Sequence, residues 1–322
     1  MPLYDKPLEE LVVYNPPLTK EADFDAFWEE TLAASAQEPL DPQVEEVDYP
    51  AVGVHVYRVS YKGWQGARIR AWYLVPEGEG PFPALVQYHG YGGSKLGAHQ
   101  YLGWALQGYV VMAVDVRGQS GESDDPARYP GGHIRGWMTM GVMDPNEYYY
   151  RGVYVDCVRA LDFVSSRPEV NSAKIGILGG SQGGGLTLAV AALDTRLAVA
   201  MPEMPYLCHF KRAVEMAVQG PYLEIADYIK RWPDRAEQVW RTLSYFDNMN
   251  LAPRILCPVL MSVGLQDDVC PPSTVFAVYN KITAPKKLQV YPFHRHESVD
   301  AHWEEKLRWA HYFLKGIGRI EL

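Results

Sequence analysis

Two kinds of hydrophobic pattern follow one another along the chain. Residues 55–61 (HVYRVSY) and 67–75 (ARIRAWYLV) alternate apolar and polar positions, which is typical of antiparallel strands. Further on, short continuous apolar runs alternate with helical segments, a pattern that indicates strands buried on both faces of a parallel sheet. These runs lie at 84–90, 109–118, 174–180, 197–204, 258–264 and 287–293. The sequence therefore predicts an α/β fold with a mostly parallel central sheet, flanked by helices, that starts with antiparallel strands.

Two segments depart from this alternation. Residues 1–48 are rich in proline and acidic residues, and one amphipathic helix fits there around 24–28. Residues 205–253 carry no strand pattern but place apolar residues at helical spacing. Helices inserted after a strand's carboxyl end would roof the rim where α/β proteins bind ligands. We therefore expect one domain over 1–322, with an N-terminal extension and a helical insertion that forms a lid or pocket wall; a packing subdomain is the alternative.

Composition narrows the class of protein. The chain has 322 residues, of which 48% are hydrophobic and 21% charged, so a large core is expected. The net charge is −9 and no Lys/Arg block stands out, which argues against nucleic-acid binding. No apolar stretch approaches the ~18 residues of a membrane span, and the N-terminus lacks the pattern of a signal peptide. The four cysteines show no metal-type spacing, so reduced thiols in the cytoplasm are expected.

The glycine-rich stretch KIGILGGSQGGG, residues 174–185, carries the first candidate chemistry. Gly179-x-Ser181-x-Gly183 fits a nucleophile elbow, in which a serine sits on a strained turn between a strand and a helix. A strand pattern precedes Ser181 and an apolar helical pattern follows it. The alternative is a glycine-rich turn without chemistry. We interpret Ser181 as a nucleophile.

Motifs for a cofactor or a metal fail on inspection. A phosphate-binding loop needs lysine and Ser/Thr after its second glycine, but Gly185 and Leu186 occupy those positions. The dinucleotide pattern fails at 90–95, where Lys95 replaces the third glycine. His296-Glu297 begins a zinc-binding HExxH pattern that Asp300 breaks. We therefore predict no cofactor and no metal.

A serine nucleophile needs a general base and a carboxylate that orients it, in the chain order Ser, Asp/Glu, His. Asp267 and Asp268 follow the apolar run that ends at 264, and both are candidates for the acid. His294 and His296 follow the last apolar run, and both qualify as the base. Our preference for Asp267 and His296 rests in part on the resemblance given below.

The reaction also needs two amide donors for an oxyanion. One is expected from the residue after the nucleophile, the backbone N–H of Gln182. The other should come from the loop after the run at 84–90, which reads His89-Gly90-Tyr91-Gly92-Gly93. We assign it to the backbone N–H of Tyr91; a simple turn is the alternative.

These motifs together resemble those of carbohydrate esterase family seven, the acetyl xylan esterases and cephalosporin-C deacetylases of the α/β-hydrolase superfamily. The resemblance runs from about residue 7 to near the C-terminus. It rests on these stretches of sequence: Arg117-Gly118-Gln119, Gly136-Trp137-Met138-Thr139, Asp144-Pro145, Tyr148-Tyr149-Tyr150-Arg151-Gly152, Gly179-Gly180-Ser181-Gln182-Gly183, Gly264-Leu265-Gln266-Asp267, Cys270-Pro271-Pro272-Ser273-Thr274-Val275-Phe276 and His296-Glu297.

The resemblance implies an α/β-hydrolase fold with a catalytic triad of Ser181, Asp267 and His296 and an oxyanion hole at Tyr91 and Gln182. It also implies a metal-free intracellular enzyme that deacetylates small acetyl esters, including acetylated xylo-oligosaccharides and cephalosporin C. A homo-hexamer with active sites facing an internal cavity is expected on the same ground. Arg117 has no evident chemical step, and we expect it to brace the catalytic loops.

Two other functions share this sequence pattern. A peptidase of the prolyl-oligopeptidase type has a similar elbow, but this chain leaves no room for a propeller gating domain. An inert binding protein of the α/β-hydrolase fold generally lacks a member of the triad, whereas all three positions are filled here.

Overall fold

The structure, a computed structural model, describes residues 4–321 and is built around one mixed sheet. Within this range the sheet has nine strands in the order β1-β2-β3-β5-β4-β6-β7-β8-β9. The strands are β1 (Gln43–Val47), β2 (Val54–Lys62), β3 (Arg68–Pro76), β4 (Phe82–Tyr88), β5 (Val110–Val114), β6 (Val170–Gly180), β7 (Leu197–Glu203), β8 (Val259–Gly264) and β9 (Lys286–Tyr291). Strands β4 to β9 run parallel to one another, and β1, β2 and β3 add antiparallel pairs at one edge. The predicted fold class is confirmed, and the six apolar runs are the six parallel strands.

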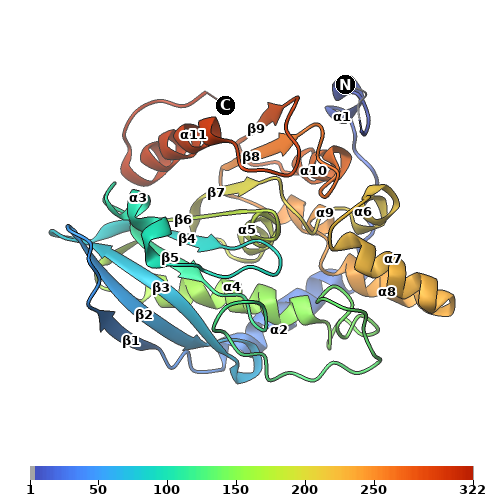
Figure 1. The fold of residues 1–322 in the computed structure, drawn as a ribbon, viewed down its shortest axis with the longest axis horizontal. Coiled ribbons are helices and arrows are strands. Elements are labelled where there is room, and N and C mark those ends of the chain that lie inside the picture. Colours follow the sequence, from blue (N-terminus) through green and yellow to red (C-terminus); the bar gives the residue numbers. More distant parts are fainter. Residues whose placement is uncertain (1–3, 322) are drawn as a thin grey trace.

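The helices cover both faces of the sheet (Figure 1). One face packs against α4 (Tyr149–Ser165), α5 (Gln182–Leu193) and α10 (Pro272–Tyr279), and α2 (Phe24–Ala36) packs against α4. The other face packs against α3 (Leu102–Ala105) and α11 (Asp300–Ala310). Side chains of β4 show the alternation: Val86 belongs to the first hydrophobic cluster and its neighbour Leu85 to the second. A strand covered on both sides must be apolar at successive positions, which explains the continuous runs in the sequence.

The N-terminal region holds more structure than the sequence pattern indicated. The helix expected around 24–28 is α2, and a short helix α1 (Leu8–Leu11) precedes it. Strand β1 was not predicted, although it lies within 1–48 and pairs with β2. Its sequence, QVEEV, is polar and almost wholly exposed because it forms the edge of the sheet. An edge strand with no buried face gives no apolar alternation to read.

Residues 205–253 are helical, as their spacing predicted. They form α6 (Phe210–Met216), α7 (Tyr222–Arg231), α8 (Ala236–Ser244) and α9 (Asn248–Leu251). Helices α7 and α8 project from the side of the sheet on which α5 and α10 lie (Figure 1). Their role as a lid or pocket wall stays a prediction. Among residues 4–321, no helix combines the length and the apolar composition needed to cross a bilayer.

Candidate active site

The turn between β6 and α5 holds Ser181 in a strained conformation. Its backbone has φ 55° and ψ −119°, a region that L-residues rarely occupy. Hydrogen bonds fix this apex: Ser181 N–H donates to the Glu203 carbonyl at 3.0 Å, and Tyr206 N–H donates to the Ser181 carbonyl at 2.9 Å. A Cβ on Gly183 would lie 2.1 Å from the Tyr88 carbonyl oxygen, so only glycine lets the helix start pass the end of β4. The surrounding structure therefore forces the serine side chain out of the turn.

Two further side chains meet this serine from the ends of later strands. His296 Nε2 lies 2.8 Å from Ser181 Oγ, and His296 Nδ1 lies 2.8 Å from Asp267 Oδ2. Asp267 is fully buried, and its Oδ1 accepts hydrogen bonds from the backbone N–H groups of Val269 (2.9 Å) and Cys270 (2.7 Å). The carboxylate is thereby fixed at one oxygen while the other faces the imidazole. The arrangement is a continuous hydrogen-bonded chain from carboxylate to hydroxyl.

The other two candidates point elsewhere. Asp268 accepts a hydrogen bond from the side-chain amide of Gln219 at 2.8 Å, and its carbonyl accepts one from Val218 N–H. The His294 ring packs edge-on against Tyr291, with ring centroids 5.3 Å apart. The geometry therefore favours Asp267 over Asp268 as the acid and His296 over His294 as the base, since Asp267 and His296 form the hydrogen-bonded chain to Ser181.

The loops that carry Asp267 and His296 are joined to each other by their backbones. Gln266 N–H donates to the His294 carbonyl at 3.0 Å, and Leu265 N–H donates to the Tyr291 carbonyl at 3.0 Å. Strand β8 ends at Gly264, where a Cβ would lie 2.5 Å from the His294 carbonyl oxygen. A side chain at this position would push the two loops apart.

Asp267, Cys270 and His296 place one potential metal-ligating atom each within 4.8 Å of one another. Both ring nitrogens of His296 already have partners in the hydrogen-bonded chain. Burial raises the pKa of the Cys270 thiol well above its usual range, so the thiolate that a metal prefers is disfavoured. These residues therefore fit the proton path better than an ion site, and the absence of a metal stays a prediction.

The two expected amide donors lie beside the serine in the chain and in the neighbouring loop. Among residues 4–321, the backbone N–H groups of Tyr91 and Gln182 make no hydrogen bond. The Gln182 side chain is fully buried; its Oε1 accepts from Gln119 Nε2 (2.9 Å) and from the Tyr150 hydroxyl (2.9 Å). Its Nε2 donates to Gln119 Oε1 at 3.1 Å. The side chain of Gln182 therefore ties the elbow to its surroundings and leaves its own backbone amide free.

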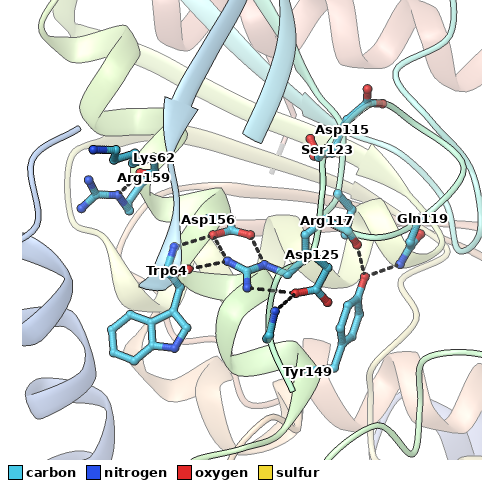
Figure 2. A network of polar contacts seen from close by, with 12 residues as sticks. Lys62, Trp64, Asp115, Arg117, Gln119, Ser123, Asp125, Tyr149, Asp156 and Arg159 are labelled. Carbon is cyan, nitrogen blue, oxygen red and sulfur yellow. Dashed lines mark hydrogen bonds and ion pairs between the residues drawn. The ribbon is translucent and has the colours of Figure 1, made fainter. Parts of the chain in front are cut away.

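Gln119 is a site residue to which the sequence analysis gave no role. Its Oε1 also accepts a hydrogen bond from Gly92 N–H at 2.9 Å, one residue after Tyr91. Its Nε2 donates to the Tyr149 hydroxyl at 3.1 Å, and that hydroxyl donates to the Arg117 carbonyl at 2.6 Å (Figure 2). One glutamine thus connects the two segments that carry the free amides. The only sequence signal was its place in the Arg117-Gly118-Gln119 motif.

Arg117 anchors the other end of this network. Its guanidinium donates to both oxygens of Asp156, at 2.6 and 2.7 Å, and to the Trp64 carbonyl at 3.0 Å (Figure 2). Trp64 N–H donates back to Asp156 at 2.8 Å, and both charged side chains are almost completely buried. A buried arginine paired with a carboxylate through two hydrogen bonds is held in a defined geometry. Its role in bracing the catalytic loops stays a prediction.

A cavity of about 380 Å³ opens onto Ser181 and His296. It is lined by the end of β4 and the loop after it, by Met204, and by the loop that follows His296. Its walls mix polar and apolar side chains: Gln87, Ser94, Leu96, Gln100, Met204, Glu297 and Ser298. The volume lies at the lower end of the range for small-molecule sites, so it suits a small substrate with polar groups.

A mostly parallel sheet with a serine elbow after one strand, and an acid and a base after two later ones, is the architecture of the α/β hydrolases. Solved structures that share less than a quarter of the sequence show the same fold. One is the α/β hydrolase GrgF from Penicillium sp. sh18, at 19% identity and TM-score 0.59 over 81% of this chain and 99% of that chain.

Comparison with known proteins defines the family. A family model described as acetyl xylan esterase (AXE1) matches residues 1–313. The chain therefore belongs to the acetyl xylan esterase family, a family of carboxylic ester hydrolases, and the resemblance drawn from the motifs is confirmed.

Solved structures of two acetyl xylan esterases are similar over nearly the whole chain. The enzyme from Paenibacillus sp. R4 is 48% identical, with a TM-score of 0.94 over 96% of this chain and 100% of that chain. Acetyl xylan esterase 1 from Thermoanaerobacterium sp. JW/SL YS485 is 35% identical, with a TM-score of 0.92 over 95% and 98% of the two chains.

Among curated proteins, acetyl esterase Axe7A of Xylanibacter ruminicola is 30% identical over 288 residues, which are 87% of this chain but 64% of the relative. The uncharacterized peptidase YuxL of Bacillus subtilis is 23% identical over 270 residues, 79% of this chain and 37% of that protein. The chain thus spans less than two thirds of either curated relative.

Proposed function

We propose that the protein is a serine esterase that removes acetyl groups from small esters. The observation that carries the proposal is the hydrogen-bonded chain Asp267–His296–Ser181, which opens on a cavity of about 380 Å³. Membership of the acetyl xylan esterase family supports the acetyl group as the part of the substrate that reacts. Acetylated xylo-oligosaccharides and the 3′-acetyl of cephalosporin C are the proposed substrates.

The proposed reaction has two halves with a covalent acetyl-enzyme between them. His296 Nε2 takes the proton of Ser181 as Oγ attacks the acetyl carbonyl carbon. Asp267 holds the imidazole in the tautomer with its proton on Nδ1 and stabilises the imidazolium that forms. His296 then protonates the leaving alcohol oxygen, and in the second half it activates a water that releases acetate.

Free backbone amides stabilise the negative charge of the tetrahedral intermediate by hydrogen bonds. Backbone N–H groups of Tyr91 and Gln182 are the proposed donors, since neither has another partner among residues 4–321. Such donors contribute most when they are fixed before the reaction, because no reorganisation is needed as charge develops. The buried hydrogen bonds of Gln119 and Gln182 supply that fixation.

The first test replaces the nucleophile. We expect Ser181→Ala to lower kcat for 4-nitrophenyl acetate by about 10⁶-fold, as in other serine triads, with little change in the urea midpoint. Labelling of the unmodified protein by a fluorophosphonate should map to Ser181 and be absent in the variant. Near-normal hydrolysis by Ser181→Ala would falsify the proposal, and absence of labelling in the parent would favour an inert binding protein.

The second test defines the substrate. Activity should fall steeply from acetate to octanoate esters, because the cavity is small. A panel of peptide nitroanilides measured beside the esters tests the peptidase alternative. That alternative is included because the chain is similar to YuxL, which is described as an uncharacterized peptidase. Preference for long acyl chains or for peptides would contradict the acetyl-esterase proposal.

The quaternary state and location are also proposals. A homo-hexamer rests on the family resemblance of the sequence, and a cytoplasmic location rests on that resemblance and on the four sparse cysteines. Sizing chromatography with light scattering tests the first, and a monomer across the micromolar range would overturn it. Cell fractionation in the source organism tests the second.

A further inference from the structure

The side chain of Tyr91 ends in a polar contact with helix α7, far away in the sequence. Its hydroxyl lies 2.8 Å from each carboxylate oxygen of Glu224 and donates its proton to that carboxylate. The same hydroxyl accepts a hydrogen bond from Trp137 N–H at 2.7 Å. Met138 N–H donates to Glu224 Oε2 at 3.1 Å. Three separate segments, the loop after β4, the loop around residue 137 and helix α7, therefore meet at one carboxylate.

The loop around residue 137 is shaped to admit this carboxylate. Gly136 has φ +94°, and a Cβ there would lie 2.1 Å from Glu224 Oε1. The Tyr91 ring packs edge-on against Trp137, with centroids 5.2 Å apart, and against Tyr206 at 6.1 Å. Tyr91 is thus fixed in both ring position and hydroxyl direction.

The contact is partly buried, which makes it sensitive to the loss of either partner. Burial raises the pKa of Glu224 and, together with the nearby carboxylate, that of Tyr91. The positive charge of Arg135 acts against this rise in the pKa of Glu224. A hydrogen bond to a charged group is stronger than a neutral one, and breaking it leaves a partly buried partner unpaired.

We propose that Glu224 is a positioning residue for the oxyanion hole, acting through the Tyr91 hydroxyl to hold the Tyr91 backbone N–H in place. The inference rests on the proposed function of that N–H as an oxyanion donor. Gln119 accepts from the next amide, Gly92 N–H, so a second side chain also fixes this loop. Oxyanion donors act over a range of only a few tenths of an ångström, and a displacement of about 1 Å costs on the order of 10²-fold in rate. The helical segment 205–253 therefore contacts the loop after β4 through the Glu224 carboxylate as well as through the Tyr206 ring.

The experiment is a double-mutant cycle on the two partners. Glu224→Ala and Tyr91→Phe each remove the contact but keep the Tyr91 backbone N–H. We expect each to lower kcat for 4-nitrophenyl acetate by about 30-fold, with KM changed less than threefold. The double variant should be no slower than the slower single variant, because both remove the same interaction. Glu224→Gln keeps a carbonyl acceptor and should stay within about fivefold of the parent. Asp227→Asn, an exposed acid on the same helix, is the matched control.

A transition-state analogue separates positioning from general damage. A trifluoromethyl ketone forms a bond between Ser181 Oγ and its carbonyl carbon, the serine proton passes to His296, and the carbonyl π pair becomes the oxyanion. Its affinity should fall in parallel with kcat/KM across the variants. A merely structural role would lower the number of titratable active sites and leave the affinity of each site unchanged.

The outcomes can be told apart. Parent-like kcat per active site and parent-like ketone affinity in Tyr91→Phe would overturn the inference, and so would effects of the two single variants that multiply in the double variant. Should Glu224→Ala fail to fold, Tyr91→Phe still decides it. Failure of the proposed function looks different, because the parent protein would itself not hydrolyse acetyl esters.

Discussion

The two sides of Ser181 are built in opposite ways. On the histidine side, residues 292–298 are exposed or half-buried, and the loop is held by backbone hydrogen bonds to the loop that carries Asp267. On the oxyanion side, Gln119 and Gln182 are buried and are held by side-chain hydrogen bonds that reach Arg117. The base must exchange protons with water and a leaving group, so access suits it. The amide donors must stay still while charge develops, so a dry and fully bonded network suits them.

The largest expected loss of activity comes from a substitution on the histidine side. Asp267→Asn should lower kcat by about 10⁴-fold, because an amide cannot stabilise the imidazolium and favours the wrong imidazole tautomer. Stopped-flow or steady-state hydrolysis of 4-nitrophenyl acetate measures the loss. Asp268→Asn is the matched control and should stay within about threefold, since Asp268 contacts Gln219 instead. A larger loss in the Asp268 variant would reverse the assignment of the acid.

On the oxyanion side, removing the buried side-chain amide of Gln119 should lower kcat less than the Asp267 substitution does, but measurably. Gln119→Leu removes the acceptor of Gly92 N–H and the two hydrogen bonds that Gln119 makes to the Gln182 side-chain amide, so we expect kcat per active site to fall about 100-fold. The lost hydrogen bonds should also lower the free energy of unfolding, by about 0.5–1.5 kcal/mol for each bond. Gln107→Leu, at an exposed glutamine, is the control. Lost stability with unchanged kcat per active site would mean that the network is a scaffold only.

The smallest expected effect is on the pH dependence of the unfolding free energy, through the buried residue His302. His302 is fully buried, lies edge-on to Tyr291 with ring centroids 6.0 Å apart, and has a pKa that burial lowers to about 4. In the unfolded chain the His302 imidazole has its ordinary pKa of about 6.5, so above that pH it is neutral in both states and does not affect stability. Between about pH 6.5 and 4 the unfolded chain binds a proton that the folded protein does not, so stability is lost as the pH falls.

His302→Leu should therefore remove about 2 kcal/mol of the decrease in unfolding free energy between pH 7 and pH 5. Urea titrations of parent and variant at both pH values measure it. His209, whose pKa is also about 4, is unchanged in the variant and cancels from the difference. An equal pH dependence in both proteins would show that His302 titrates normally.

What the sequence could predict follows the same contrast. Ser181 and Asp267 follow the ends of strands with buried runs, and His296 follows β9, a half-buried edge strand that still carries an apolar run. Strand ends can be read from such local runs. The bracing side chains cannot be read this way. Gln119 meets Gln182 across 63 positions and Tyr91 meets Glu224 across 133, and nothing in the spacing marks either pair. Strand β1 was missed for a related reason, since its partner rather than its own sequence makes it a strand.

Gly264 has a consequence for engineering the enzyme. The carbonyl of His294 occupies the space where a side chain on residue 264 would lie. The loop that carries Asp267 and the loop that carries His296 therefore form one structural unit. Grafting either loop alone into another scaffold would separate the imidazole from its carboxylate, whereas moving 264–268 together with 291–296 preserves their mutual register. Directed evolution that diversifies this part of the rim should therefore draw both loops from the same parent and leave the glycine fixed.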